Sequence, residues 1–483
     1  MKYQSILAAL LGAACVSVAH AGPQLIAIGT LSGNLHDLSS QTGGALENGV
    51  AGNLLGGVGS ALAWAGGNSF IATPDRGPNA SAYNPLVDDT TSYIARVQTL
   101  NLGLTANTSG SGLAFNLTPT LSATTLLSSS TALAYGSGAR GTGKVGAANY
   151  TLGNGTPALN AINNTNYFTG RSDNFDAGKT SLNPDNGRFD PEGARVSNDG
   201  KSVFISDEYG PYVYQFDRAT GQRIKSFALP ANLGIANLNA RGALEISNNT
   251  ASGRVANKGM EGLAITPDGK TLVGIMQAPL AQDTGKTVRI VSIDIASGGV
   301  HQYAYQLTTG SGASEIVALN NHQFIVDERD GKGLGDGTNA LVKQLYKIDL
   351  AGAQDVTSLS GNIASKAVSK TLLLDIVSVL GANGISASQV PAKIEGLAFG
   401  QDVMLGNVLT HTLYVANDND FVANLAGHNK FFVFGMTDAD LLAVGAGYTP
   451  QDIAAAAVVP EPQSLALMML GLLMLGSLHQ RRK

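Results

Sequence analysis

The stretch PEGARVSNDGKSVFISDEYGPYVYQFDRATGQRIKSFAL, residues 191–229, decides the fold class of this chain. It contains an apolar strand, a polar SNDGK turn, a second strand that ends in Asp207-Glu208, and two further strands joined across DRATGQ. Apolar runs that end at Gly, Asn, Asp and Pro predict β-strands joined by tight turns. Four consecutive strands of this kind are typical of one blade of a β-propeller.

The same order of strands returns in other parts of the chain. Including the first stretch, the units are residues 57–102, 189–229, 260–307, 313–350 and 394–436. The segment QLIAIGTLSG, residues 24–33, can supply a strand that closes the ring with the last unit. We therefore expect an all-β protein, a β-propeller of about six four-stranded blades, of which five are readable and one is hidden. A β-sandwich or a solenoid is the alternative.

The N-terminal residues 1–21 predict a secretory signal peptide. They contain Lys2, an apolar stretch and the small-x-small sequence Ala19-His20-Ala21, which is the pattern of a cleaved leader. Cys15 is the only cysteine and lies inside this segment. A mature chain would therefore have no thiol for a disulfide, a thiolate metal site or a nucleophile. A lipoprotein signal at Cys15 is the alternative interpretation.

The C-terminal residues 460–483 contain Pro460-Glu461-Pro462, an apolar stretch over 464–478, and the basic end Arg481-Arg482-Lys483. The apolar stretch is shorter than the roughly 20 residues that a membrane-spanning helix needs. This order resembles the PEP-CTERM sorting signal of Gram-negative bacteria. The resemblance implies a short hydrophobic helix, transient membrane association and processing by signal peptidase and an exosortase-type enzyme. It also implies a place in the periplasm, at the outer surface or in the extracellular matrix. A plain C-terminal anchor is the alternative.

The composition of the body agrees with an extracellular β-protein. Charged residues make up 13% of the chain, about half the usual share, and there are 60 glycines. The net charge of −5 and the absence of a basic cluster from the body argue against nucleic acid as a partner. We expect a propeller domain over 22–436, a long insertion over 103–188, and a linker over 437–459.

Polar residues recur at a fixed spacing across the first two strands of the units. Ser60 is followed after sixteen residues by Arg76, Glu192 by Glu208, and Glu261 by Gln277. A fixed spacing in a repeat returns to the same point around one axis. The leading positions, Ser60, Glu192, Glu261, Glu315 and Glu395, are therefore predicted to meet at one mouth of the central channel.

Four glutamates at one mouth need compensation, either from a cation or from raised pKa values. Carboxylate oxygens are the ligands that Ca²⁺ prefers. The trailing positions add Asp207, Glu208 and Asp418 near the same mouth, while Arg76 and Arg329 can bind an anionic group. The candidate metal ligands are therefore Glu192, Glu261, Glu315, Glu395, Asp207 and Asp418, and the candidate catalytic residues are Glu192, Glu261, Glu395, Arg76 and Glu208.

Each of these residues also has a purely structural interpretation, because acidic residues at blade turns often only bond backbone amides. Other chemistries lack their motifs. No G-x-S-x-G elbow, H-E-x-x-H pair, Walker motif or Rossmann motif is present in the required context. An Asp-rich loop, residues 172–187, lacks the full order of a calcium-binding loop.

Several stretches resemble the phytase-like family, described as having an esterase-like activity of phytase. They are ATPDRGP (72–78), FDPEGARVSNDGKSVFISDEYGP (189–211), NKGMEGLAITPDGKTL (257–272), FIVDERDG (324–331), and KIEGLAF with VANDNDF (393–421). The resemblance implies a secreted propeller that hydrolyses phosphate or carboxyl esters. The chain departs from the pattern at MQAP, residues 276–279, and at NDND, residues 417–420.

Two functions follow from these observations as hypotheses. The first is an exported, Ca²⁺-dependent hydrolase of small anionic esters, in which Arg76 and Arg329 bind the anion. The second is a non-catalytic propeller that binds a surface glycan or a protein in the exopolysaccharide matrix, with a structural ion at the ring. A lactonase-like activity is a further alternative.

Overall fold

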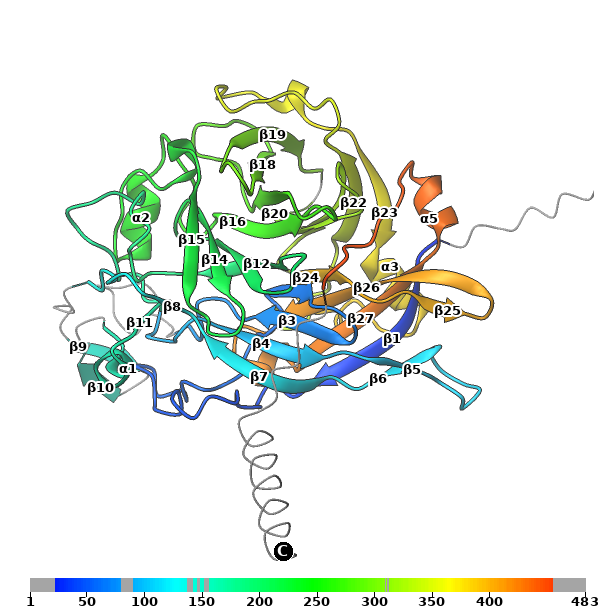
Figure 1. Ribbon diagram of the computed structural model, residues 1–483, viewed down its shortest axis with the longest axis horizontal. Coiled ribbons are helices and arrows are strands. Elements are labelled where there is room, and N and C mark those ends of the chain that lie inside the picture. Colours follow the sequence, from blue (N-terminus) through cyan, green and yellow to red (C-terminus); the bar gives the residue numbers. More distant parts are fainter. Residues whose placement is uncertain are drawn as a thin grey trace, which may run out of the picture.

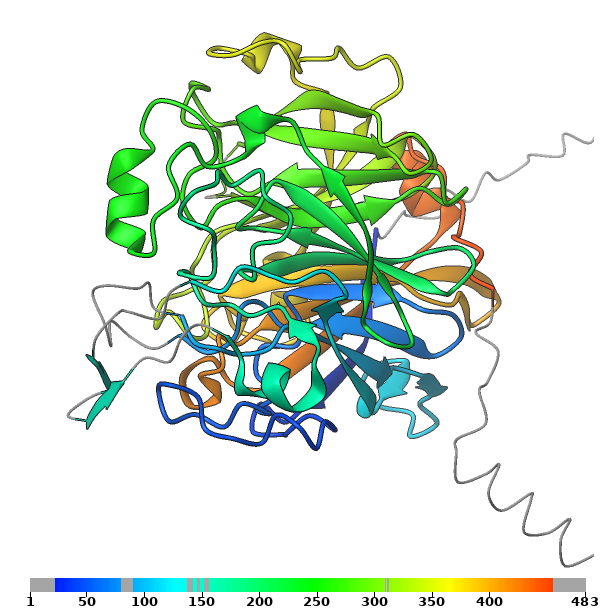
Figure 2. The same ribbon diagram turned by 60° about the vertical axis from the view of Figure 1, so that its left-hand side comes forward.

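The chain folds into a ring of antiparallel sheets around one axis, as Figure 1 and Figure 2 show from two sides. The structure is a computed structural model that describes residues 22–79, 90–136, 142–145, 148–151, 156–308, 310 and 312–454. The predicted signal peptide and the predicted C-terminal hydrophobic helix lie outside the described residues.

Each main sheet is one propeller blade, and in blades one to four the strands follow in chain order from the axis outward. Blade one contains β2 (Ala61–Trp64), β3 (Ser69–Thr73), β4 (Arg96–Asn101) and β7 (Thr120–Leu126). Blade two contains β12 (Pro191–Val196), β13 (Ser202–Asp207), β14 (Tyr212–Asp217) and β15 (Arg223–Ala228). Blade three contains β16 (Met260–Ile265), β17 (Thr271–Met276), β18 (Thr287–Asp294) and β19 (Val300–Gln306).

Blade four contains β20 (Gly312–Ala318), β21 (Gln323–Arg329), β22 (Lys343–Asp349) and β23 (Lys370–Asp375). Blade five combines β24 (Lys393–Phe399), β26 (Val408–Asp418) and β27 (Asn429–Met436) with the N-terminal strand β1 (Gln24–Leu31), and β25 (Val403–Leu405) pairs with β26. Strand β1 runs antiparallel to β27, from Gln24 opposite Gly435 to Leu31 opposite Asn429. The prediction that residues 24–33 close the ring is confirmed.

The propeller has five blades within the described residues, so the expectation of about six was wrong. The inner strands β2, β12, β16, β20 and β24 are neighbours in a closed ring, and β24 of the last blade contacts β2 of the first. A hidden blade therefore has no gap to occupy. The outer strand of blade one, β7, lies within the stretch 103–188 that the sequence analysis treated as an insertion.

The rest of that stretch forms short elements beside the ring. They are β5 (Leu104–Ala106), β6 (Phe115–Leu117), β8 (Ser128–Ser129), β9 (Thr142–Val145), β10 (Ala148–Thr151), α1 (Ala158–Asn163) and β11 (Asn166–Tyr167). The other short helices are η1 (Ala231–Leu233), α2 (Gly242–Asn248), η2 (Ala364–Lys366), α3 (Ile376–Ala382), α4 (Ala423–Ala426) and α5 (Asp438–Ala443). None of the helices in the described residues is long and apolar enough to cross a membrane.

Apolar side chains between neighbouring blades hold the ring together. One cluster joins blades one and two around Ile71 and Val203, and another joins blades two and three around Phe204 and Leu272. Three further clusters fill the remaining junctions between blades. Because each blade is covered on both faces by its neighbours, its inner strand is buried along nearly its whole length, as in β12, β16 and β20.

Glycine at the third residue of the inner strands β12 and β16 lets these strands approach their neighbours. A Cβ atom at Gly193 would lie 2.4 Å from the Leu263 nitrogen, and one at Gly262 would lie 2.6 Å from the Glu315 Cα. Side chains do not fit at such distances from a neighbouring backbone. In the Glu-Gly pairs at Glu192 and Glu261, the glycine therefore allows the neighbouring strand to pack closely, and the glutamate supplies the charge.

The segment after α5 crosses the far mouth of the channel as far as Ala454. The Thr449 N–H donates to the Leu319 carbonyl oxygen at 2.8 Å, and Ala454 N–H donates to the Asn198 carbonyl oxygen at 2.8 Å. Residues 444–454, which we call the strap, thus join blades four and two. This packed segment lies where the sequence predicted a linker.

Candidate functional site

The predicted glutamates lie in β-bulges at the start of the inner strands. The pairing register shifts around Glu192 in β12, around Glu261 in β16, and around Glu395 in β24. A bulge carries an extra residue and redirects its side chain. The three glutamates therefore start from equivalent positions around one mouth of the channel.

Glu315 does not share this position. In blade four the bulge lies between Ala313 and Glu315, so Ser314 is the residue equivalent to the other glutamates. Glu315 Oε1 accepts backbone hydrogen bonds from Leu263 and Ile316, both at 2.9 Å, and Oε2 lies 3.2 Å from Arg195 Nη2. The structure therefore places Glu315 between inner strands, outside the group of acids at the mouth.

The mouth contains more carboxylates than the sequence analysis named. We call this group the acidic centre; it consists of Asp75, Asp190, Glu192, Glu208, Glu261, Glu395, Asp418 and Asp420, with Arg76, Arg329 and Lys393 among them. Three overlapping triplets each bring one oxygen per residue within 4.8 Å of the others. The acidic centre therefore offers three possible positions for a cation.

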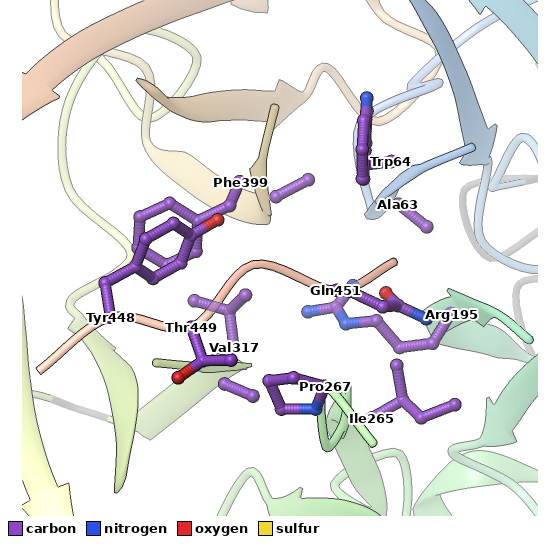
Figure 3. A pocket seen from close by; sticks show the side chains of 12 residues that line it. Ala63, Trp64, Arg195, Ile265, Pro267, Val317, Phe399, Tyr448, Thr449 and Gln451 are labelled. Carbon is purple, nitrogen blue, oxygen red and sulfur yellow. The ribbon is translucent and has the colours of Figure 1, made fainter. Parts of the chain in front are cut away.

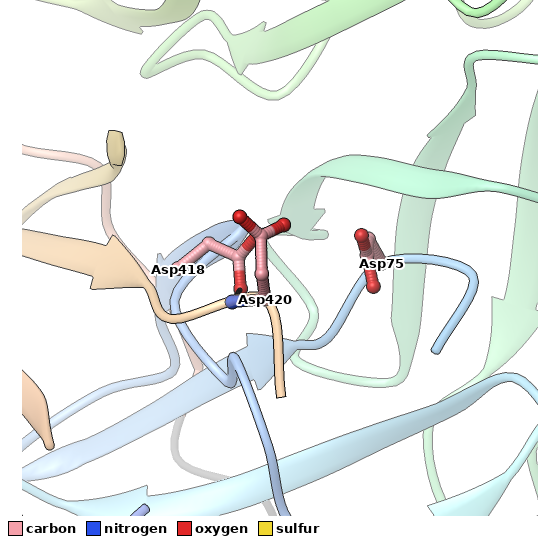
Figure 4. A group of neighbouring side chains, drawn as sticks. All are labelled: Asp75, Asp418 and Asp420. Carbon is pink, nitrogen blue, oxygen red and sulfur yellow. Dashed lines mark hydrogen bonds between the residues drawn. The ribbon is translucent and has the colours of Figure 1, made fainter. Parts of the chain in front are cut away.

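The first triplet, Asp75, Asp418 and Asp420, is shown in Figure 4. Lys393 Nζ lies 2.9 Å from Asp418 Oδ2 and also forms an ion pair with Asp420. The ammonium group therefore already compensates two of these three carboxylates. Asp418, a predicted metal ligand, lies in this triplet.

The second triplet is Asp75, Asp190 and Glu192. Arg76 binds Asp190 twice, through its backbone N–H to Oδ1 at 2.9 Å and through Nη1 to Oδ2 at 3.1 Å. Here too a cationic side chain compensates one of the acids. The partner of the predicted anion-binding Arg76 is therefore Asp190.

The third triplet, Glu192, Glu208 and Glu261, has only a shared cation, Arg329, which pairs with Glu395 as well as with Glu261. Glu192 is 6% exposed, Glu208 is 2% exposed and Glu261 is 3% exposed. Glu208 Oε1 and Glu261 Oε2 are buried and have no hydrogen-bond partner among the described residues. The other oxygen of Glu261 accepts from Gln277 Nε2 at 2.7 Å and lies 3.5 Å from Arg329 Nη2.

Burial makes the ionised forms of these acids unfavourable. It raises the pKa of Glu208 and of Glu261 to about 7, with repulsion between neighbouring carboxylates as a further cause. Burial and the same repulsion raise the pKa of Glu192 well above its ordinary value. At neutral pH this triplet therefore either retains protons or needs a positive charge.

Three cationic side chains and Asp420, which is 34% exposed at its side chain, form the more exposed part of the centre. Arg76 is 16% exposed, Arg329 is 12% exposed and Lys393 is 31% exposed at their side chains. Arg329 forms an ion pair with Glu395 and reaches Glu261 at 3.5 Å. The centre thus combines buried acids with cations that solvent can reach.

Asp207 has a different role from the one predicted. Its Oδ1 accepts the backbone N–H of Asp190 at 3.1 Å and of Tyr209 at 2.9 Å. Burial raises the pKa of Asp207 to about 7. The residue fixes the backbone next to Asp190, and it belongs to none of the three triplets.

The sequence analysis missed Asp190, Lys393 and Asp420. Asp190 lies two residues before Glu192, and Lys393 lies two residues before Glu395. The position two residues before the Glu-Gly pair therefore carries an acid in blade two and a base in blade five. A comparison of this position between units would have revealed both charges. Asp420 stands on a loop with φ of 52°, a backbone form that no spacing rule predicts.

The channel is closed below the acidic centre. Arg195 extends from β12 and donates from Nη1 to the Leu62 carbonyl oxygen at 2.7 Å and from Nη2 to the Ile316 carbonyl oxygen at 2.8 Å. Beyond it, a cavity of about 40 Å³ is bounded by Arg195, Trp64 and Phe399 and covered by Tyr448 and Gln451 of the strap (Figure 3). Among the described residues, Arg195 therefore lies between the acidic centre and the strap at the far mouth.

A family model and a curated protein match parts of this chain. The family model described as "Phytase-like: Esterase-like activity of phytase" matches residues 53–421. An uncharacterized secreted protein of the fungus Arthroderma benhamiae is 30% identical over 178 residues, which are 29% of this chain and 34% of that protein. The match thus spans about a third of the relative's length.

Two solved structures with low similarity are a luciferin-regenerating enzyme and the hydrazine synthase of Kuenenia stuttgartiensis. The first is 12% identical with a TM-score of 0.32 and covers 83% of this chain and 96% of its own. The second is 10% identical with a TM-score of 0.29 and covers 77% and 79%. The propeller assignment rests on the sheet topology described above.

Proposed function

Because the chain belongs to the phytase-like family, whose model covers residues 53–421, we propose that it is an exported hydrolase of small anionic esters that works with a divalent cation. The secreted relative supports export. The proposal includes sorting through the C-terminal residues 460–483 to the cell surface. The buried triplet of Glu192, Glu208 and Glu261 carries the part that concerns the cation.

The triplet fits a calcium-type cation by its chemistry. It offers carboxylate oxygens only, and two of these are buried without a donor among the described residues. Ca²⁺ takes six to eight oxygen ligands and accepts carboxylates in one- or two-oxygen modes. When bound, the cation would polarise a phosphoryl or carbonyl oxygen of the ester.

The other two triplets fit a cation less well. In one, Lys393 pairs with Asp418 and Asp420; in the other, Arg76 holds Asp190 through two hydrogen bonds. A metal ion there would have to displace or approach a positive side chain. We therefore assign the ion to Glu192, Glu208 and Glu261, and we leave Glu315, Asp207 and Asp418 out of the ligand set.

The cations of the centre would bind the anionic part of the ester. Arg76 and Arg329 lie at the exposed side, and a guanidinium group can form two parallel hydrogen bonds to a phosphate or a carboxylate. Asp190, with a pKa raised to about 7 mainly by burial, can exchange a proton near neutral pH. A group with this pKa suits general acid–base catalysis.

A non-catalytic propeller with a structural ion is the second candidate. The depth of the three glutamates, none more than 6% exposed, favours it, because an ion there would join the inner strands of blades two and three. In that case the ring would bind a glycan or protein without turnover.

The test is hydrolysis of p-nitrophenyl phosphate and p-nitrophenyl acetate by the full chain after treatment with EDTA and again after addition of Ca²⁺. We expect EDTA to abolish hydrolysis of at least one ester, Ca²⁺ to restore it, and Glu261→Gln to lower the rate by orders of magnitude. Full activity of Glu261→Gln would contradict the proposal.

A further inference from the structure

An exposed apolar hairpin stands on the face opposite the acidic centre. It consists of β25 and the start of β26 and reads VMLGNVL over residues 403–409. Met404 is 56% exposed, Val408 is 53% exposed and Leu409 is 51% exposed. The segment has no charged residue, which is unusual for a projecting loop on a soluble surface.

The hairpin is a firm element and not a loose loop. Its strands pair from Val403 opposite Thr410 to Leu405 opposite Val408, and Met404 stands opposite Leu409. Val403 and Leu405 pack against the core between blades five and one. Cross-strand partners share a face, so Met404 and Leu409 form one outward apolar surface while the other face is fixed to the propeller.

One further exposed apolar residue lies on a helix that is linked to the hairpin. Leu442 on α5 is 75% exposed. The base of the hairpin and the start of α5 are joined by His411, whose Nδ1 lies 3.0 Å from Asp402 Oδ1 and whose Nε2 lies 3.1 Å from Asp438 Oδ1. Figure 2 shows α5 and the β25–β26 hairpin on one side and α2 on the other.

The described chain ends on this same face. Ala454 N–H bonds to the Asn198 carbonyl oxygen in the turn between β12 and β13, at the far mouth of the channel. The sequence beyond it contains an apolar stretch over 464–478 followed by Arg481, Arg482 and Lys483. About ten residues separate Ala454 from the apolar stretch. A surface that binds the apolar stretch would therefore lie closest to the face that carries the hairpin.

We propose that Met404, Leu409 and Leu442 form a lipid-contacting surface that inserts into the interfacial layer of a bilayer. Apolar side chains of peripheral proteins enter about 5–10 Å into this layer. The tail supplies high local concentration, and the hairpin fixes the orientation. The acidic centre then faces away from the lipid.

The test uses the full chain with Cys15→Ser, so that an added cysteine is the only thiol. Met404→Cys carries an environment-sensitive fluorophore, and Ile246→Cys is the matched control, because Ile246 is 57% exposed but lies on α2. The probes are vesicles of phosphatidylethanolamine and phosphatidylglycerol, with and without a nitroxide-labelled lipid.

We expect the label at 404 to shift to the blue and to be quenched at least about twofold by the nitroxide lipid, while the label at 246 stays in water. Met404→Asp with Leu409→Asp should lower vesicle partition of the full chain several-fold, and Ile246→Asp should not. A water-exposed label at 404 on vesicle-bound chain would overturn the proposal. So would a blue shift at 404 without vesicles that grows with protein concentration, because it would indicate a second copy of the chain as the partner.

Discussion

Arg195 and Glu315 form an ion pair inside the propeller channel, with Arg195 Nη2 3.2 Å from Glu315 Oε2. Arg195 comes from blade two, and Glu315 comes from blade four and also binds the Leu263 N–H of blade three at 2.9 Å. The pair links three blades on the axis and separates the acidic centre from the far mouth. A charge that the sequence placed among metal ligands is therefore part of the ring's internal packing.

The first prediction concerns this pair. Arg195→Met leaves the buried Glu315 without its cation and should lower the free energy of unfolding by about 3–5 kcal/mol, because breaking a buried pair strands one charge. The double variant Arg195→Met with Glu315→Gln should recover a large part of the loss. Urea unfolding measures both. A loss of less than about 1 kcal/mol for the single variant would show that the pair does not hold the ring.

The second prediction assigns the cation to one triplet. Glu192→Gln keeps the shape of the side chain but removes a charge from the triplet of Glu192, Glu208 and Glu261, and it should weaken Ca²⁺ binding at least about tenfold. Asp418→Asn is the matched control, because Lys393 already compensates Asp418 at 2.9 Å. Isothermal titration calorimetry on the full chain compares them. A larger loss in Asp418→Asn would move the ion to the triplet of Asp75, Asp418 and Asp420.

The third prediction is a pH dependence. The pKa of Glu208 and of Glu261 is raised from 4.5 to about 7, mainly by burial, so between these values the folded chain binds more protons than the unfolded chain. The free energy of unfolding of the metal-free chain should therefore fall as pH rises from 4.5 to 7, by up to about 1.4 kcal/mol per pH unit for each group. Saturating Ca²⁺ should remove this slope. Urea unfolding in EDTA measures this slope. A free energy of unfolding that increases from pH 4.5 to pH 7 would contradict the prediction.

The fourth prediction tests the close approach of the inner strands. Gly262→Ala would place a Cβ 2.6 Å from the Glu315 Cα, and such overpacking should cost about 1–3 kcal/mol. Gly44→Ala is the control, because a Cβ at Gly44 meets nothing within 4 Å. Thermal unfolding separates them. Equal midpoints for the two variants would show that the strands can move apart freely.

Much of this fold can be predicted from the sequence, because each blade carries its own strands and turns. The unit around Glu192 and the closing strand at residues 24–33 are local patterns, and the structure confirms both. The number of blades is set by how the inner strands fit around the axis, which no single unit encodes. That is why a sixth blade was expected where β24 already contacts β2.

The positions of the site residues could be predicted only where the register of the inner strand was clear from the sequence. Glu192, Glu261 and Glu395 follow the Glu-Gly pattern and lie together, whereas Glu315 precedes Ile316 and is one residue out of phase. A shift of one residue in a strand sends a side chain to a different side. Arg76 reaches Asp190 across the junction between blades one and two, whereas Lys393 stands opposite Asp418 within blade five, beside a loop turned at Asp420. Such contacts leave no periodic trace.

The most direct test of the central claim is one Ca²⁺ titration of the EDTA-treated full chain in which bound calcium and hydrolysis of the preferred p-nitrophenyl ester are measured in the same samples. The account predicts that hydrolysis rises in step with binding at one site, and that Glu208→Gln loses both. Calcium that binds without any hydrolysis, or hydrolysis that is complete in EDTA, would contradict it.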